Sequence, residues 1–99
     1  MDINIKEDDD RITVSVKGDI ELYTHAKFKN RLFELTQTSD KNIDIDLSKV
    51  DYMDSSGLGT LVSLHKIQNK KGRKLTISNV NADIRNLIRL STLSDIFEV

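Results

Sequence analysis

The 99-residue chain contains no cysteine, no proline and no tryptophan. The absence of cysteine excludes disulfide bonds, thiolate metal sites and a cysteine nucleophile, and it fits a reducing compartment. No run approaches the ~20 apolar residues that a membrane span needs. The N-terminus MDINIKEDDD has neither the basic lead nor the apolar stretch of a secretion signal. We therefore expect a cytoplasmic protein that does not contact a membrane.

Neither sign of charge dominates, because 15 basic residues face 16 acidic ones. The densest basic cluster lies within residues 66–74 and has no interleaved aromatic residue, so we expect no nucleic-acid partner. Aromatic residues are scarce, with three Phe and two Tyr, so the core has to consist mainly of Ile, Leu and Val. The length fits a single domain that spans residues 1–99.

Apolar residues alternate with polar ones in four stretches, near residues 3–5, 12–17, 43–47 and 75–78. This period of two, with many β-branched residues, predicts half-buried strands. Three further stretches have helical spacing, which gives the order β-β-α-β-α-β-α; Ile96 and Phe97 add a last short strand or helix. We expect an α/β fold with a mixed sheet of four to five strands. An N-terminal hairpin is followed by parallel crossovers, and three or more helices pack mainly on one face.

The helix ends carry recognisable signals. We expect Thr24 to cap a first helix whose inner face includes Phe28, Leu32 and Leu35. Asn81 is expected to cap the third helix. The second helix should end at Gly72, a residue suited to the left-handed conformation that stops a helix.

Two loops follow parallel strands at their carboxyl ends, where sites gather in α/β sheets. These are Gly18-Asp19-Ile20-Glu21 and the segment from Asp51 to Gly57. Topology predicts that both lie at the same end of the molecule. The second loop opens a helix with Asp54, Ser55 and Ser56, and this start allows four interpretations.

The simplest interpretation is a helix cap, in which Asp and Ser satisfy free backbone amides. It does not explain Gly57 and Gly59 in the first turn, since a plain cap needs neither glycine. Close approach of another group to the helix start would explain them. A serine nucleophile is disfavoured, because G-x-S-x-G is absent and neither His25 nor His65 is clearly in reach. A nucleotide phosphate loop is excluded, because no lysine follows the glycines in register.

The fourth interpretation is a phosphoacceptor. A serine at a helix N-terminus can be phosphorylated by a partner, and free amides and the helix dipole would stabilise the new dianion. The added charge, beside acidic residues of both loops, would repel a docked protein while leaving the fold intact. The residues alone do not choose between Ser55 and Ser56. We expect no catalytic residue, no metal site and no cofactor.

The motif D-L-S-x-V-x-Y-M-D-S-S-G-L-G, residues 46–59, resembles the central motif of bacterial anti-sigma factor antagonists, the single-domain STAS proteins. Residues 18–24 resemble their first loop, and residues 83–97 resemble their last helix and end. The resemblance covers nearly the whole chain.

The resemblance implies partner switching. An unphosphorylated antagonist of this kind binds a serine kinase that is also an anti-sigma factor, and thereby releases a sigma factor. The kinase, using ATP and Mg²⁺, phosphorylates the first serine of the motif, here Ser55, which ends binding; a PP2C-type phosphatase restores it. The positions that the resemblance implies for partner binding are Asp19, Glu21, Tyr23, Thr24, Asp54, Ser56, Gly57, Leu58 and Gly59.

Three positions depart from the family pattern: Glu21 stands where Asp is usual, Thr92 replaces a common glycine, and the chain ends early at Val99. The alternative function is an accessory STAS module of another complex, in membrane transport or in signalling that does not involve a sigma factor.

Overall fold

Strands and helices alternate along residues 1–91 and 96–97, the part of the chain that this computed structural model describes. The elements are β1 (Asp2–Glu7), β2 (Arg11–Lys17), α1 (His25–Thr38), β3 (Asn42–Lys49), α2 (Ser55–Lys70), β4 (Leu75–Ser78) and α3 (Ala82–Leu90). This is the order that the periodicity predicts. None of these helices is long and apolar enough to cross a membrane.

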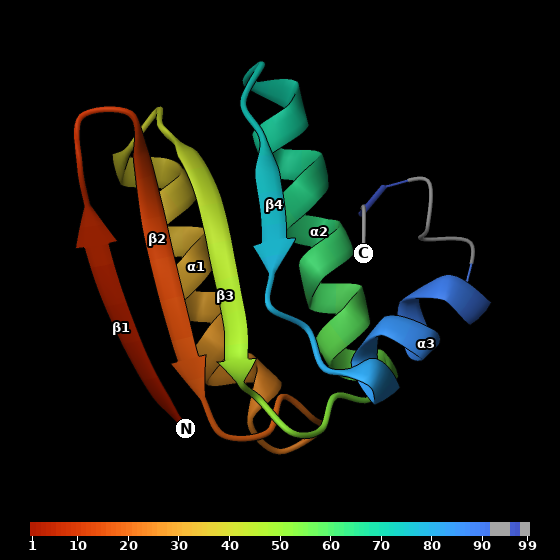
Figure 1. Cartoon of the computed structure of the whole chain (residues 1–99). Helices are drawn as coiled ribbons and strands as arrows, with labels where there is room; N and C mark the ends of the chain where they lie inside the picture. The colour runs from red at the N-terminus through yellow and green to blue at the C-terminus, as the bar shows by residue number, and fades with distance from the viewer. Residues whose placement is uncertain (92–95, 98–99) are drawn as a thin grey trace.

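The strands form one sheet in the order β1-β2-β3-β4. β1 pairs antiparallel with β2 at one edge, whereas β2-β3 and β3-β4 are parallel. Figure 1 shows α1 and α2 behind the same face of the sheet, and α3 beside the start of α2. The predicted fold class, a single α/β domain with an N-terminal hairpin and parallel crossovers, is confirmed.

The core fills the space between the sheet and the helices, and it is built mainly from Ile, Leu and Val as the composition requires. Alternate strand residues point inward, so register pairs such as Ile12–Ile43 and Ile43–Leu75 stack across the sheet. The intervening residues are polar and lie on the open face. Fully or almost fully buried side chains include Ile12, Val14, Phe28, Leu32, Ile45, Leu47, Leu61, Ile84 and Ile88.

Two of the three predicted helix ends are confirmed, and the third is wrong in its mechanism. The Asn81 side chain accepts a hydrogen bond from the Ile84 amide, and Gly72 follows α2 with a φ of +70°. Thr24 occupies the position before α1, but its side chain makes no cap. Its hydroxyl donates instead to the Asp19 carbonyl (2.7 Å) and accepts from the Glu21 amide (3.1 Å). Thr24 therefore braces the preceding loop.

The end of the chain departs from the expected last strand or helix. Ile96 and Phe97 form a turn and a bend, and Phe97 is buried with its ring centroid 5.8 Å from that of His65. The departures at Thr92 and Val99 fall outside the described residues.

Candidate functional site

The two candidate loops meet at one end of the sheet, as the parallel topology predicts. Ile20 and Met53 form an isolated parallel bridge. The Ile20 amide donates to the Tyr52 carbonyl (3.0 Å), and the Asp54 amide donates to the Ile20 carbonyl (3.2 Å). Figure 1 shows both loops below the arrowheads of β2 and β3, next to the start of α2. The segments are thus one rigid unit.

Asp54 is both the cap of α2 and the link between the loops. Its Oδ1 accepts from the amides of Ser56 (2.9 Å) and Gly57 (3.3 Å). Its Oδ2 accepts from the Leu22 amide at 3.1 Å. One carboxylate therefore holds three backbone donors, which fixes the start of the helix against the first loop.

Ser55 is the first residue of α2 and is exposed. The expectation that free amides surround it needs correction. The amide of Asp54 is bonded to Ile20, and the amides of Ser56 and Gly57 are bonded to the Asp54 carboxylate. Of the four amides that a helix start leaves over, only that of Ser55 itself has no such partner among the described residues. A group attached to the Ser55 hydroxyl would therefore extend into solvent beside a carboxylate.

The two glycines of the α2 start have different environments. A Cβ on Gly57 would lie 2.6 Å from Met53 Cγ, 2.8 Å from the Ile20 carbonyl oxygen and 2.9 Å from Ile20 Cγ2. The close approach that the glycine pattern predicts is thus made, at this position, by the first loop of the same chain. A Cβ on Gly59 would have nothing within 4 Å, and Gly59 is exposed.

The neighbouring Leu58 is only 7% exposed and belongs to the core, and Gly57 is buried as well. Both residues were expected to bind a partner. In the structure they offer it almost no surface, so their contribution to a docking site is to hold its shape.

The acidic residues of the first loop differ in availability. The Glu21 carboxylate accepts from the Tyr23 amide at 3.0 Å and so is directed at its own loop. Asp19 is exposed, and its carbonyl is the acceptor for Thr24. Glu21 is the position that departs from the family pattern. Its carboxylate therefore has a structural role, because it accepts a hydrogen bond within its own loop.

Exposed apolar side chains lie on both loops. Leu22 is 60% exposed, Tyr23 87% and Tyr52 55%. We call these three residues the apolar rim. The family resemblance implies partner binding for Tyr23 alone. Leu22 and Tyr52 are large apolar residues in loops, outside the strands and helices. Large exposed apolar side chains that gather at one end of a protein are typical of a protein-binding surface.

The first histidine is engaged in the same loop. His25 Nδ1 lies 3.2 Å from the Glu21 carbonyl and 3.0 Å from the Leu22 carbonyl, so this nitrogen carries the proton and donates. In that tautomer Nδ1 cannot act as a base for a serine.

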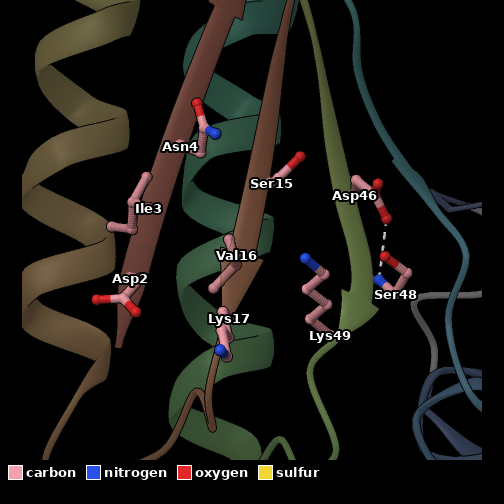
Figure 2. Close-up of a pocket in the computed structure, with 9 residues that line it drawn as sticks. All are labelled: Asp2, Ile3, Asn4, Ser15, Val16, Lys17, Asp46, Ser48 and Lys49. Carbon is pink, nitrogen blue, oxygen red and sulfur yellow. Dashed lines mark hydrogen bonds between the residues drawn. The ribbon is translucent and has the colours of Figure 1, made fainter.

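The sheet carries a separate hollow of about 370 Å³ with a mixed polar and apolar lining, drawn in Figure 2. Its carboxylate Asp46 accepts from the Ser48 amide at 2.9 Å. This bond is the main reason why the pKa of Asp46 is lowered from 3.8; burial opposes the shift and Asn79 supports it. The next carboxylate of the same strand, Asp44, accepts from the hydroxyls of Thr76 and Ser78. The acidic side chains of β3 thus form hydrogen bonds that stabilise the sheet and its adjoining loops.

Comparison with known proteins identifies the fold family. The STAS domain model matches residues 2–99. The chain belongs to the STAS family. The anti-sigma-B factor antagonist of Listeria monocytogenes is 37% identical over 101 residues, covering 100% of this chain and 88% of that protein. The predicted resemblance to STAS-domain anti-sigma factor antagonists is therefore confirmed.

Solved structures of other STAS proteins share the fold. An anti-sigma factor antagonist from Mycobacterium paratuberculosis has a TM-score of 0.86 at 22% identity, with 98% of this chain and 82% of that chain covered. The phosphorylated form of SpoIIAA, a Bacillus cell fate determinant, has a TM-score of 0.76 at 12% identity, with 97% and 88% covered.

Proposed function

We propose that this STAS protein is an anti-sigma factor antagonist whose binding ends when Ser55 is phosphorylated. It is a non-enzymatic regulator, and chemistry is supplied by its partners. The unphosphorylated form binds an anti-sigma factor that is also a serine kinase and so frees a sigma factor in the cytoplasm. The kinase brings ATP and Mg²⁺, and a PP2C-type phosphatase reverses the modification.

The observation that carries the proposal is the position of Ser55. It is exposed at the first turn of α2, on a loop held by the Asp54 carboxylate and the Ile20–Met53 bridge. An accessible hydroxyl is what a kinase needs in its acceptor. Support from relatives comes from the phosphorylated structure of SpoIIAA and from the anti-sigma-B factor antagonist of Listeria monocytogenes.

The occupied amides explain how a phosphate would act. Because Asp54 already binds the amides of Ser56 and Gly57, the helix start has little left to neutralise a dianion. The phosphate, with a charge of about −1.5 to −2, would remain on the docking surface next to a carboxylate. A partner that covers Ser55 would have to bury this charge without a matching donor, which costs binding free energy. The backbone would stay in place.

The apolar rim supplies the contact area. Leu22, Tyr23 and Tyr52 lie on the two loops and give a partner apolar surface to bury. Asp19 is an exposed acidic residue on the first loop. Asp54 shapes the acceptor loop, while Gly59 leaves space above the helix.

The test is phosphorylation of this protein by a partner kinase that it captures from cell extract. Protein captured from cell extract is incubated with ATP and Mg²⁺, and the modified residue is mapped by mass spectrometry. We expect phosphate on Ser55, none in Ser55→Ala, and normal transfer in the control Ser56→Ala. Modification of Ser56 alone, or no transfer by any bound kinase, would contradict the proposal. An accessory role in another complex stays a prediction.

A further inference from the structure

β1 forms an open edge of the sheet. In the described part of the chain it pairs only with β2, over six consecutive residues and without a register shift. Proteins shield such edges with proline, a bulge, a very short strand or charged side chains, and β1 carries charges of both signs, at Asp2, Lys6 and Glu7. β1 has no proline, no bulge and six residues, and its opposite charges can pair with those of a second copy, so its outer backbone groups are available for another strand.

The hydrogen-bonding pattern identifies those groups. At the hairpin the Asp8 amide donates to the Arg11 carbonyl (3.0 Å), and at the far end of β2 the Gly18 amide donates to Lys49 of β3 (3.1 Å). Bonding alternates along an antiparallel strand. Even-numbered residues of β1 therefore bond to β2, and the amides and carbonyls of Ile3 and Ile5 face outward.

We propose that a second copy of this chain pairs with β1 along this edge, antiparallel and with the two-fold axis at Asn4. In this register Ile3 of one copy lies opposite Ile5 of the other, and the two exchange backbone hydrogen bonds. Asp2 of each copy lies opposite Lys6 of the other. The two sheets become one continuous sheet of eight strands. This inference does not rest on the proposed function.

The sequence of β1 favours this register over its neighbours. Centring the axis on Ile5 would place the apolar side chain of Ile3 opposite the charged side chain of Glu7. Centring it on Ile3 would leave Asp2 opposite Asn4 and lose both ion pairs. Only the axis at Asn4 gives two isoleucine pairs on one face and two opposite-charge pairs on the other, and both kinds of cross-strand pair are stabilising.

The burial of β1 agrees with this arrangement. Ile3 and Ile5 are half-buried and pack against the core, so the helix-side face of the edge is apolar and incompletely covered. A groove of about 540 Å³ lies beneath this edge between β1 and α1; Ile3 lines it on the strand side, and polar and charged side chains such as Lys27 and Arg31 line it on the helix side. A second β1 would place its own isoleucines over that groove.

The other face keeps its charged pairs in the open. Figure 2 draws Asp2 beside Lys17, its register neighbour in β2. Lys6 has Thr13 as its register neighbour and forms no ion pair among the described residues. The lysine is therefore free for Asp2 of the second copy. Figure 1 shows β1 at the edge away from β4 and α3, so pairing leaves that side uncovered.

The first experiment measures mass against concentration, by sedimentation equilibrium from the micromolar to the millimolar range. We expect the unmodified protein to form dimers as concentration rises. Asp2→Lys and Lys6→Glu should each weaken the dimer at least about tenfold, because each creates two like-charge pairs. The double variant Asp2→Lys/Lys6→Glu should restore it. Lys66→Glu, which makes the same charge change as Lys6→Glu on the exposed face of α2, is the control.

The second experiment measures amide hydrogen exchange at low and high concentration. The amides of Ile3 and Ile5 should become protected only when the dimer forms, whereas that of Asn4 should be protected throughout. A protein that stays monomeric, a dimer that leaves Ile3 and Ile5 exchanging freely, or a double variant as weak as the single ones would each overturn the inference.

Discussion

The Leu22 amide donates to Asp54 Oδ2 at 3.1 Å, although the two residues are 32 positions apart. The same carboxylate caps α2 through Oδ1. The loop after β2 and the acceptor loop after β3 are therefore held by one side chain. Any partner that binds at Ser55 would contact both loops in one fixed arrangement.

Substitution of Asp54 separates its two roles. Asp54→Ala should lower the free energy of unfolding by about 2–3 kcal/mol, because the cap and the loop bond are both lost. Asp54→Asn should cost only about 1 kcal/mol, because asparagine caps as well as aspartate but turns an amide donor toward the Leu22 N–H. Amide exchange is the readout: Leu22 should lose protection in both variants, and Ser56 in Asp54→Ala only. Equal exchange of the Ser56 amide in the two variants would contradict this division.

The two glycines of α2 should respond to alanine in opposite directions. Gly57→Ala forces a Cβ to within 2.8 Å of the Ile20 carbonyl, so it should destabilise the protein by about 1–3 kcal/mol. Gly59→Ala meets no atom within 4 Å and should stabilise the helix by up to about 1 kcal/mol. Thermal or chemical denaturation of the two variants measures these changes. A loss of stability in both Gly57→Ala and Gly59→Ala would contradict the different environments of the two glycines.

The stability of the sheet should depend on pH through Asp46. Its folded pKa is lowered from 3.8, mainly by the Ser48 amide, so the ionised form contributes stability above about pH 4. This contribution is lost as pH falls through the lowered pKa. Chemical denaturation should therefore show a stability difference between the unmodified protein and Asp46→Asn at neutral pH that shrinks in strong acid. A difference that is independent of pH would argue against the charged hydrogen bond.

The apolar rim should contribute to partner binding and not to folding. Tyr23→Ala removes an 87% exposed ring, so unfolding should change by less than about 0.5 kcal/mol, while affinity for the kinase should fall about tenfold or more. Phe33→Ala, a 46% exposed ring on α1, is the matched control and should bind normally. Equal losses of affinity in the two variants would exclude a specific role for Tyr23.

The element order and the meeting of the two loops could be predicted, because strand alternation and parallel crossovers determine both. Ile12, Ile43 and Leu75 face inward by period two alone. The capping of α3 by Asn81 could be predicted as well, because the amide that it binds, that of Ile84, lies only three residues away.

Contacts between distant segments could not be predicted. Nothing in the local sequence says that Asp54 reaches Leu22 or that Ile20 crowds Gly57. Thr24 has the sequence signature of a cap, but its hydroxyl oxygen accepts from the Glu21 amide of the preceding loop and from no amide of the helix start. The amides of Ser56 and Gly57 are occupied by a local contact, the Asp54 carboxylate, and the helix-cap interpretation of the sequence includes this bond.

The central claim is that a phosphate on Ser55 ends binding while the scaffold keeps its shape. Titration calorimetry of the purified kinase, against the unmodified protein and against protein phosphorylated enzymatically on Ser55, tests it most directly. The account predicts that the phosphorylated form binds at least about a hundredfold more weakly, a difference of about 2.7 kcal/mol. Equal affinities for the two forms would contradict it.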